Sequence, residues 1–490
     1  MRLVSLLDRD VPKALPWADM DITSVSADSR TIVPGGVFVA LKGTKMDGAR
    51  FVGRAIGRGA AAVLVGEGVC VEVPPGYPLI RVANPHRALA RAAARFYAPP
   101  PEVMVAVTGT NGKTSVVSFV RQIWEMLGFT PASLGTLGVS APAGHRSLDR
   151  TTPDPVTLHA LLSDLQSEGV THAAVEASSH GLAQYRLDGV KLAAAAFTNL
   201  SRDHLDYHNT VESYFAAKAR LFAELLPRGA GAVVNVDNGY GPRIAAIARE
   251  RNLTLATVGK TGADLRLAGR RREAGGQRLT IALKGREHSV FLPFLGDFQA
   301  ENALLAAGLV MAAGGGGERA VQALSQLKGA EGRLEYVAMT REAAPVYVDY
   351  AHTPDALNTV LRAVRPYVSG RLVVVFGAGG DRDHGKRALM GQAVARYGDV
   401  AIVTDDNPRM EAPAVIRRAV LAGCPDACEI GDRGEAIAYG MSVLKKGDVM
   451  LVAGKGHEGG QLVGDTVIPF SDRAVIRSLS HGLDGRRAKS

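Results

Sequence analysis

The stretch "VAVTGTNGKTS", residues 105–115, decides the fold in the middle of this chain. The apolar run at 103–107 has the pattern of a buried strand, and "VVSFVRQIWEML" at 116–127 carries apolar side chains at helical spacing. Residues 109–114 therefore lie between a strand and a helix N-terminus. Glycines let the backbone approach a phosphate there, and free N–H groups with the helix dipole favour the anion. The stretch predicts a phosphate-binding loop in an α/β domain.

The loop departs from the common pattern G-x-x-x-x-G-K-[ST], because Val107 stands where the first glycine is expected. We interpret this as a strand that continues through Val107, with the turn beginning at Gly109. Lys113 is then placed to reach the outer phosphates of ATP, and the Thr114 hydroxyl to ligate Mg²⁺. The alternative is a glycine turn with a solvated lysine, and the flanking strand and helix argue against it. The predicted ATP loop comprises Gly109, Thr110, Asn111, Gly112, Lys113, Thr114 and Ser115.

The composition is that of a globular protein without membrane insertion. A chain of 490 residues is too long for one ordinary core and predicts about three domains. It has no apolar run of the ~18 residues that a membrane helix needs, and "MRLVSLLDRDVPK" has too short an apolar run for a secretory signal. Cys70, Cys424 and Cys428 cannot form a disulfide framework and lack the companion ligands of a zinc site. We therefore expect a cytoplasmic location.

The net charge is +9, from 57 basic and 48 acidic residues. The basic runs at 269–273 and 485–490 are short and lack interleaved aromatic residues. Scattered, solvated arginines are therefore favoured over a nucleic-acid partner. A basic balance would also suit a small polyanionic substrate.

Two breaks divide the chain. "YAPPPE" at 97–102 and "GAEGR" at 329–333 predict domains near 1–98, 99–330 and 331–490. The last two alternate short apolar runs with helical patterns, which indicates parallel α/β sheets. The predicted strands are "VMVAVTG" (103–109), "THAAVEASS" (171–179), "AAAAFTNLS" (193–201), "VYVDY" (346–350), "RLVVVFGAGG" (371–380), "VAIVTDDNP" (400–408) and "VMLVAGKGHE" (449–458). Their carboxyl ends are polar or glycine-rich, where open parallel sheets bind ligands.

"TGTNGKTS" resembles the nucleotide loop of the Mur ligase superfamily, ATP-dependent amide-forming enzymes whose loop also lacks the first glycine. The likeness covers nearly the whole chain. The other matching motifs are "DSRTIVPGGVFVALKG" (28–43), "TTPD" (151–154), "EASSHGL" (176–182), "TNLSRDHLDYH" (198–208), "AAKARLF" (216–222), "ENALLAA" (301–307), "EGRLE" (331–335), "DYAHTP" (349–354), "GGDRD" (379–383), "DDNPR" (405–409) and "GKGHE" (454–458). The resemblance implies an N-terminal α/β UDP-binding domain, a central parallel-sheet P-loop ATPase-like domain and a C-terminal Rossmann-like α/β domain.

The resemblance also implies a reaction. ATP phosphorylates a carboxylate, and an amine attacks the acyl phosphate; the charges that gather in such a pocket call for cations. The motifs are similar to those of the members that add meso-2,6-diaminopimelate to UDP-N-acetylmuramoyl-L-alanyl-D-glutamate in peptidoglycan precursor synthesis. The partners would then be small molecules, and a monomer is expected.

Four residues are predicted to carry the chemistry: Lys113, Glu176, His204 and Lys218. The resemblance makes Glu176 and His204 Mg²⁺ ligands beside Thr114. Taken alone, Glu176 could cap a helix and His204 could be an ordinary loop histidine. Lys218 lies in "YFAAKARLF", an amphipathic pattern in which a lysine is normally solvated. The resemblance implies instead that CO₂ carbamylates Lys218, whose carboxylate would then ligate a second Mg²⁺.

For the rest of ATP, the resemblance implies contacts from Asn302, Arg333 and Asp349, with His352 a further candidate. The alternative for Asn302 is a polar residue on the solvent face of a helix. The residues that match UDP-substrate positions are Ala27, Ser29, Thr151, Thr152, Ser178, Gln184 and Arg186. Arg150 and residues 43–48 depart from the family pattern on the uridine side.

The choice of amino acid rests on "DDNPR". meso-Diaminopimelate differs from lysine by one distal carboxylate, and Arg409 could bind that group through two parallel hydrogen bonds. Glu458 would hold the distal ammonium. The predicted pocket is Arg382, Asp406, Asn407, Pro408, Arg409, Gly454 and Glu458. A lysine-adding ligase on the same scaffold, a folylpolyglutamate synthase-like ligase and a non-catalytic nucleotide-binding regulator are the alternatives, and Arg409 beside a proline turn could be a surface residue.

Overall fold

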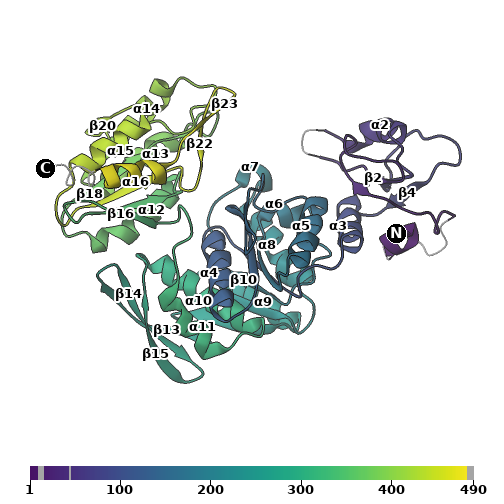
Figure 1. Ribbon diagram of the computed structural model, residues 1–490, viewed down its shortest axis with the longest axis horizontal. Coiled ribbons are helices and arrows are strands. Elements are labelled where there is room, and N and C mark those ends of the chain that lie inside the picture. Colours follow the sequence, from purple (N-terminus) through teal and green to yellow (C-terminus); the bar gives the residue numbers. More distant parts are fainter. Residues whose placement is uncertain (9–15, 44–45, 483–490) are drawn as a thin grey trace. The chain divides into compact units, whose positions relative to one another are not determined.

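Parallel sheets organise the parts of the chain that the structure, a computed structural model, describes: residues 1–8, 16–43 and 46–482 (Figure 1). By its internal contacts the chain divides into two units. One comprises Met1–Ala268, Ile281–His288 and Glu301–Leu324, and the other Gly269–Thr280, Ser289–Ala300 and Ser325–Ser490. Residues 44–45 of the 43–48 segment and the basic run at 485–490 lie outside the described residues.

The N-terminal sheet has four parallel strands in chain order, β1 (Val25–Ser26), β2 (Val37–Val39), β3 (Ala62–Gly66) and β4 (Leu79–Val82). Its helices are α1 (Leu3–Leu7), α2 (Val52–Gly57) and α3 (Pro85–Phe96). Alternate residues of β2 and β3 face two separate apolar clusters, so both faces of the sheet are covered. Asn84 begins α3 by accepting the Arg87 N–H, and Pro85 occupies the first turn.

The central sheet has eleven strands, in the order β15-β14-β13-β12-β11-β10-β5-β9-β6-β7-β8. The bounds of its strands are β5 (Val103–Thr108), β6 (Pro131–Gly135), β7 (Gly138–Ala141), β8 (Gly144–Arg146), β9 (His172–Glu176), β10 (Ala194–Phe197), β11 (Gly231–Asn235), β12 (Thr254–Gly259), β13 (Leu265–Glu273), β14 (Gly276–Leu283) and β15 (Arg286–Leu292). The strands from β12 to β6 in that order pair in parallel.

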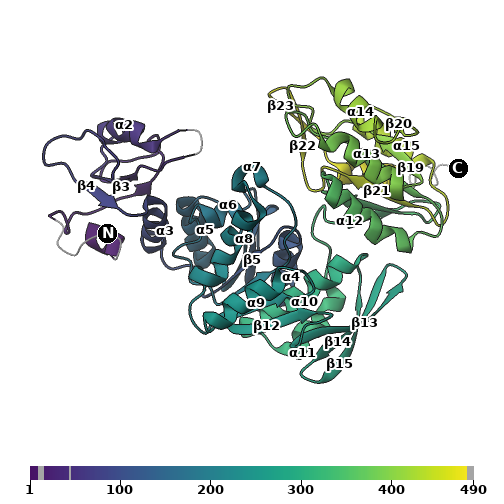
Figure 2. The same cartoon turned by 180° about the vertical axis from the view of Figure 1, so that it is seen from behind.

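Helices cover both faces of the parallel strands. α5 (Pro155–Ser167), α6 (Ser179–Ala183), α8 (Val211–Arg220) and α9 (Gly241–Glu250) share one apolar cluster with Met104 and Ala106. Figures 1 and 2 show α4 (Lys113–Met126), α10 (Asp297–Ala312) and α11 (Gly317–Ala323) on the opposite side. One turn of π-helix, Leu221–Leu225, ends α8. Buried on both faces, the strands are apolar without alternation, which is why they could be predicted.

The C-terminal sheet has six strands in the order β16-β17-β21-β18-β19-β20. The bounds are β16 (Glu335–Met339), β17 (Pro345–Asp349), β18 (Leu372–Phe376), β19 (Val400–Val403), β20 (Cys428–Glu429) and β21 (Val449–Ala453), and a separate hairpin is formed by β22 (Gly460–Val463) and β23 (Thr466–Pro469). Its helices are α12 (Pro354–Val364), α13 (Lys386–Tyr397), α14 (Pro413–Leu421), α15 (Arg433–Ser442) and α16 (Asp472–Gly482).

The predicted α/β class and three-domain architecture are confirmed. All seven predicted strands are present, and the predicted helix after the loop is α4. The antiparallel β7 and β8, the strands β13 to β15 and the β22–β23 hairpin were not predicted. No helix in the described part of the chain is long and apolar enough to cross a membrane. The domain boundaries near 98 and 330 stay predictions.

A buried ion pair joins the start of α15 to the start of α16. Arg433 donates to both carboxylate oxygens of Asp472 (2.7 and 2.8 Å), and both side chains are fully buried. Arg433 also donates to the Ala453 carbonyl (3.0 Å) at the end of β21. The pair therefore anchors two helices to the strand end that precedes "GKGHE".

We expect Asp472→Asn to lower the free energy of unfolding by about 3–5 kcal/mol, because it leaves a buried guanidinium without its counter-charge. Urea unfolding at neutral pH measures the change. The matched control is Glu318→Gln, which breaks the exposed Arg286–Glu318 pair and should change little. Equal effects of the two substitutions would contradict the importance of the buried pair.

Candidate active site

Three neighbouring strand ends form the base of the candidate site. β5 lies between β9 and β10 in parallel pairing, which places Gly109, Glu176 and Thr198 at the same edge of the sheet. The Thr198 hydroxyl donates to the Asn111 carbonyl (2.6 Å), and the Asn111 N–H donates to Asn199 Oδ1 (3.0 Å). The segment after β10 therefore holds the predicted phosphate loop in place.

The loop requires glycine at two positions. Gly109 has φ +149° and Gly112 has φ +90°, conformations that side chains rarely adopt. A Cβ at Gly109 would overlap the Thr198 hydroxyl, and one at Gly112 would overlap the side-chain oxygen of Asn302. Asn302 is buried on α10. It therefore lies against the loop, and the alternative of a solvent-facing asparagine is wrong; a contact with ATP stays a prediction.

Lys113 and Lys218 meet at one backbone carbonyl. The Lys113 ammonium donates to the carbonyls of Gly109 (3.0 Å) and Thr110 (2.8 Å), and Lys218 Nζ donates to the same Gly109 carbonyl (2.6 Å). Lys218 reaches the loop from α8, which is far away in sequence. The structure thus brings together two lysines that the sequence could relate only by resemblance.

The surroundings of Lys218 suit a neutral amine better than an ammonium. The side chain is 1% exposed, and its one hydrogen-bond acceptor among the described residues is Gly109 O. The Tyr214 ring centre lies 4.4 Å from Nζ. Burial, followed by the charge of Lys113, places the pKa of Lys218 well below its ordinary value, against a weaker opposing effect of Asp203. The prediction of a solvated lysine from the amphipathic pattern is therefore wrong.

Glu176, the last residue of β9, is buried with its carboxylate held in one orientation. The Thr136 N–H donates to Oε1 (2.8 Å), and the Thr136 hydroxyl donates to Oε2 (3.2 Å). The hydroxyl that caps α6 belongs to Ser178, which accepts the Gly181 N–H (3.0 Å). The helix-capping alternative for Glu176 is therefore wrong.

His204 lies directly before α7 (Leu205–His208), in a left-handed conformation. Its side chain is half exposed, and Nε2 lies 3.5 Å from Asp203 Oδ2. Its ring centre is 5.0 Å from that of His180 and 6.0 Å from that of Tyr214. The Tyr214 hydroxyl is 3.2 Å from the Thr110 hydroxyl. His204 is thus at the rim of the same loop.

A metal ion at this site would need ligands other than a cluster of three His, Cys, Asp or Glu side chains. Across residues 1–8, 16–43 and 46–482, no three His, Cys, Asp or Glu side chains are grouped so that they could hold one. The predicted donors are the Glu176 carboxylate, the Thr114 hydroxyl and the imidazole of His204. Mg²⁺ prefers oxygen ligands, which the carboxylate and the hydroxyl supply.

Three residues predicted to bind the UDP-substrate are linked to Glu176 by its backbone. The Thr152 hydroxyl donates to the Glu176 carbonyl (2.7 Å) and accepts the Ser178 N–H (3.0 Å). The hydroxyls of Thr151 and Thr136 are 3.0 Å apart. These contacts place Thr151, Thr152 and Ser178 beside the carboxylate.

Gln184 and Arg186 extend the same cluster. Arg186 donates to Gln184 Oε1 (2.6 Å) and to the Thr152 carbonyl (2.5 Å). Burial, and then the charge of nearby Arg150, lowers the pKa of Arg186. Asp154 and Tyr207 oppose this effect.

Ala27 and Ser29 lie after β1 in the N-terminal sheet, where Ser29 is buried and Ala27 half-buried. Neighbouring Asp28 is engaged by Arg30 through two charged hydrogen bonds (3.0 and 2.7 Å). Ala27 and Ser29 follow a strand of the N-terminal sheet, whereas Thr152 follows a strand of the central one.

In the C-terminal sheet, Arg409 is held with part of its guanidinium free. It has φ +52°, and backbone hydrogen bonds to Leu462 (3.0 Å) and Gly464 (2.8 Å) hold that conformation. NH1 donates to the carbonyl of Gly380 (2.7 Å) and more weakly to that of Asn407 (3.4 Å). Among the described residues, Nε and NH2 have no acceptor. That edge has the geometry to bind a carboxylate through two bonds.

The next residues of the predicted pocket are packed against one another. A Cβ at Gly454 (φ +118°) would lie 2.5 Å from Asp406 Oδ2, and one at Gly380 would overlap the Pro408 carbonyl. Asn407 Nδ2 donates to Glu458 Oε2 (2.9 Å). Pro408 and Asp406 are buried. The structure therefore brings these residues together at the carboxyl ends of β19 and β21.

Arg382 lies in the exposed turn after β18. Its Cγ would lie 3.9 Å from a Cβ at Gly379, and the Arg409 NH1 group 2.8 Å from the same position. The alternative of Arg409 as a surface arginine beside a proline turn is therefore wrong, because its guanidinium returns to the strand end.

Arg333, Asp349 and His352 lie at the carboxyl end of β17. Arg333 stacks on the Tyr350 ring (4.6 Å). Asp349 accepts the N–H groups of Leu334 and Ala351 (both 2.7 Å). Burial raises the pKa of the Asp349 carboxyl, with Arg333 opposing. By accepting these two N–H groups, the Asp349 carboxylate holds the turn that carries Arg333 in place.

Three residues at the two sites were missed from the sequence. Thr136 orients Glu176 through its backbone and hydroxyl. Lys386 donates to the His352 carbonyl (3.1 Å), and burial lowers its pKa, with Asp406 opposing. Lys455 lies inside the "GKGHE" motif and is fully buried. The Gly-Lys-Gly pattern at a predicted strand end is the sequence signal from which Lys455 could have been identified.

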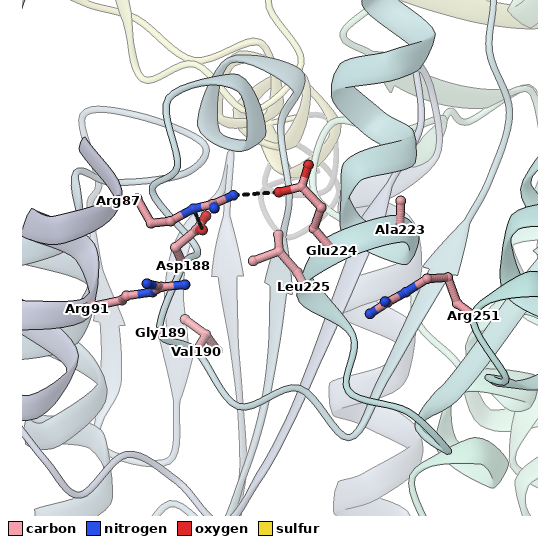
Figure 3. Close-up of a pocket in the computed structure, with 9 residues that line it drawn as sticks. All are labelled: Arg87, Arg91, Asp188, Gly189, Val190, Ala223, Glu224, Leu225 and Arg251. Carbon is pink, nitrogen blue, oxygen red and sulfur yellow. Dashed lines mark hydrogen bonds and ion pairs between the residues drawn. The ribbon is translucent and has the colours of Figure 1, made fainter. Parts of the chain in front are cut away.

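A cavity of about 520 Å³ is lined by Arg87, Arg91, Asp188, Gly189, Val190, Ala223, Glu224, Leu225 and Arg251 (Figure 3). Arg87 pairs with Asp188 (3.0 Å) and Glu224 (2.6 Å). Arg87 and Arg220 both lie over the Tyr185 ring (4.9 and 4.1 Å). Since Tyr185 separates Gln184 from Arg186, this charged network supports the substrate segment from behind; none of the lining residues was a predicted site residue.

Comparisons with known proteins cover nearly all of the chain. Family models match at residues 21–97 (Mur ligase family, catalytic domain), 107–310 (Mur ligase middle domain) and 332–456 (Mur ligase, glutamate ligase domain). The chain is 52% identical to the UDP-N-acetylmuramoyl-L-alanyl-D-glutamate–2,6-diaminopimelate ligases of Rhizobium meliloti (95% of this chain, 96% of the relative) and Agrobacterium fabrum (96% and 95%). A solved structure of a ligase of that name has a TM-score of 0.75 and 32% identity, covering 99% of each chain.

We expect Gly135→Ala to destabilise the protein by about 1–3 kcal/mol, because the added Cβ would overlap the buried, hydrogen-bonded Glu176 carboxylate. Urea unfolding measures this. Gly57→Ala, at a helical glycine with nothing within 4 Å of the added Cβ, is the control and should be neutral or mildly stabilising. Wild-type stability of Gly135→Ala would show that Glu176 is not held there.

Proposed function

The chain belongs to the Mur ligase family, and we propose how its residues carry out the reaction for which its diaminopimelate-adding relatives are named. It is an ATP-dependent amide-forming ligase that adds meso-2,6-diaminopimelate to the D-glutamate of UDP-N-acetylmuramoyl-L-alanyl-D-glutamate in peptidoglycan precursor synthesis. The structural observation that carries the choice of amino acid is the free Nε/NH2 edge of Arg409 at the carboxyl end of β19.

The reaction proceeds in two transfers. The D-glutamate carboxylate attacks the γ-phosphorus of ATP, ADP leaves, and an acyl phosphate forms. The amine of diaminopimelate, having lost a proton, attacks the acyl carbon, and phosphate leaves with the electrons of the broken C–O bond. Lys113 balances charge on the transferring phosphoryl group, and the loop amides from Gly109 to Ser115 bind the phosphates.

Thr114, Glu176, His204 and carbamylated Lys218 are the residues that would hold Mg²⁺, in two sites. When bound, the ions neutralise phosphate charge during transfer. The donor set at the strand ends fits this role, since it is made of oxygen and imidazole ligands. Thr136 keeps the Glu176 carboxylate oriented.

A carbamate on Lys218 is supported by the poor fit of an ammonium there. Carbamylation needs the neutral amine as nucleophile: nitrogen attacks the carbon of CO₂ and loses a proton, which turns a cation into a carboxylate. Burial and the charge of Lys113 lower the pKa of Lys218, which favours that neutral amine. The resulting anion beside Lys113 replaces a repulsion with an attraction.

The remaining contacts follow the family pattern. Asn302, Arg333 and Asp349 bind the rest of ATP, with His352 a further candidate. Ala27, Ser29, Thr151, Thr152, Ser178, Gln184 and Arg186 bind the UDP-substrate, whose pyrophosphate and carboxylates suit hydroxyl and guanidinium donors. We further propose domains at 1–98, 99–330 and 331–490, a monomer in the cytoplasm, and small molecules rather than nucleic acid as partners.

Arg409 selects diaminopimelate over lysine. Its free edge binds the distal carboxylate, and Glu458 binds the distal ammonium. Arg382, Asp406, Asn407, Pro408 and Gly454 complete the pocket. Lysine would leave the guanidinium edge without an anion, which penalises its binding.

Phosphate release from ATP tests this function, with the UDP-dipeptide substrate and either meso-diaminopimelate or lysine. We expect release with diaminopimelate. Arg409→Ala should raise KM for diaminopimelate tenfold or more, by about 1.4 kcal/mol or more, and leave KM for ATP nearly unchanged. Arg418→Ala, at an exposed arginine of α14, is the control. Release with neither amino acid would refute the ligase assignment, and release with lysine alone would refute the role of Arg409.

Carbamylation of Lys218 is tested by ¹³C NMR after addition of ¹³C-bicarbonate. A carbamate signal is expected in wild type and not in Lys218→Ala, whose lost activity bicarbonate alone does not restore. Because the pKa of Lys218 is lowered, the neutral amine and the carbamate should persist at pH values where ordinary lysines are protonated, and diminish as the pH falls further. Full activity of Lys218→Ala would contradict the assignment.

A further inference from the structure

We propose that Lys455 is a positioning residue of the amino-acid pocket, whose buried ammonium orients the Asn407 amide and the Glu458 carboxylate and leaves Glu458 Oε1 to bind the substrate's distal ammonium. This inference rests on the proposed function. It assigns a role to the lysine of "GKGHE", which the sequence analysis left without one.

The Lys455 side chain is fully buried, and each of its near partners belongs to the pocket. Nζ donates to Asn407 Oδ1 (3.0 Å) and to Glu458 Oε2 (2.9 Å), and lies 3.9 Å from Asp406 Oδ1. A buried ammonium is costly unless paired and hydrogen-bonded. Here two carboxylates flank it, so its charge is compensated within the pocket.

Glycines on both sides bring Lys455 to this position. Gly454 has φ +118°, and Gly456 has φ +56°. A Cβ at Gly454 would lie 2.5 Å from Asp406 Oδ2, and one at Gly456 would lie 2.8 Å from the Tyr350 Cβ. The backbone after β21 can therefore press against two other strand ends and direct the lysine inward.

Lys455 determines which way the Asn407 amide faces. A lysine ammonium only donates hydrogen bonds, so the amide oxygen must face it. The same oxygen accepts the Leu462 N–H (2.9 Å), and Nδ2 is left to donate to Glu458 Oε2. Without Lys455, only the Leu462 N–H and the Glu458 carboxylate would hold the amide in this orientation.

Lys455 also helps to keep the Glu458 carboxylate ionised, and it binds only one of the two carboxylate oxygens. Burial alone would raise the pKa of Glu458, but the Lys455 ammonium and the Asn407 amide hold it below its ordinary value. Both groups bind Oε2. Among the described residues none donates to Oε1, and the side chain is 31% exposed. One oxygen is anchored, and the other is available to a cationic ligand.

Asn407 connects this carboxylate to the predicted carboxylate site. Its backbone carbonyl accepts a bond from Arg409 NH1 (3.4 Å), while its side chain contacts Lys455 and Glu458. The distal centre of diaminopimelate carries both an ammonium and a carboxylate. Glu458 Oε1 and the free Arg409 edge are a complementary pair of groups, and Lys455 fixes one half of that pair.

Initial rates of phosphate release test the proposal in wild type, Lys455→Met and the control Lys446→Met, an exposed lysine of the same domain. We expect Lys455→Met to raise KM for diaminopimelate about tenfold or more, while KM for ATP and for the UDP-dipeptide substrate stay within about twofold. Lys446→Met should match wild type. Lys455→Gln is predicted to show the same pattern and replaces Lys455→Met if that variant does not fold.

A pH series separates positioning from a merely structural role. In Lys455→Met the pKa of Glu458 should rise, because burial is no longer opposed by the ammonium. A protonated Glu458 cannot pair with an ammonium, so KM for diaminopimelate should climb as the pH falls, over a range where wild type is flat. In Glu458→Gln this pH-dependence should vanish, and adding Lys455→Met should raise KM little further.

Unchanged KM for diaminopimelate in Lys455→Met, or equal increases of KM for all three substrates, would overturn the inference. These outcomes are distinct from failure of the proposed function, which would appear as the absence of diaminopimelate-dependent phosphate release in wild type. Additive effects of Lys455→Met and Glu458→Gln would also overturn it, because a residue that acts through Glu458 has no effect once Glu458 is gone.

Discussion

The close approach of the phosphate loop to the end of β10 is the constraint on which the central site depends. The Thr198 hydroxyl occupies the space that a side chain at residue 109 would need, and it bonds to the carbonyl of Asn111. With Gly109 pressed against this neighbour, its carbonyl is available to Lys113 from one side and Lys218 from the other. If the loop lay further from the sheet, the Gly109 carbonyl could not accept hydrogen bonds from lysines of both α4 and α8.

The strands and the phosphate loop could be predicted because their signals are local. Buried parallel strands are apolar throughout, and a glycine-lysine-threonine turn between a strand and a helix needs no distant partner to be identified. The contacts around the loop are different, since they depend on where α8 and α10 pack. Lys218 has the amphipathic neighbours of a solvated residue, and its burial follows only from the fold of the whole domain.

Contacts that depend on the packing of distant segments were also missed in the C-terminal domain. Asn407 and Lys455 are far apart in the chain and belong to different strand ends, and only the sheet order β21-β18-β19 brings them into contact. Arg409 was predicted to be a carboxylate ligand from its motif. Its left-handed backbone and its anchoring by the β22–β23 hairpin could not be inferred, because that hairpin has no strong pattern of its own.

The two buried lysines illustrate how surroundings decide what an amine does. Lys218 has a carbonyl and an aromatic ring beside it, with another ammonium close by, and so its neutral form is favoured and open to reaction with CO₂. Lys455 has Glu458 and Asp406 beside it, so its ammonium is paired and serves as a fixed hydrogen-bond donor. Both side chains are inaccessible to solvent. The difference lies in the nearest carboxylates, and it suits Lys218 to the proposed carbamylation and Lys455 to the proposed positioning role.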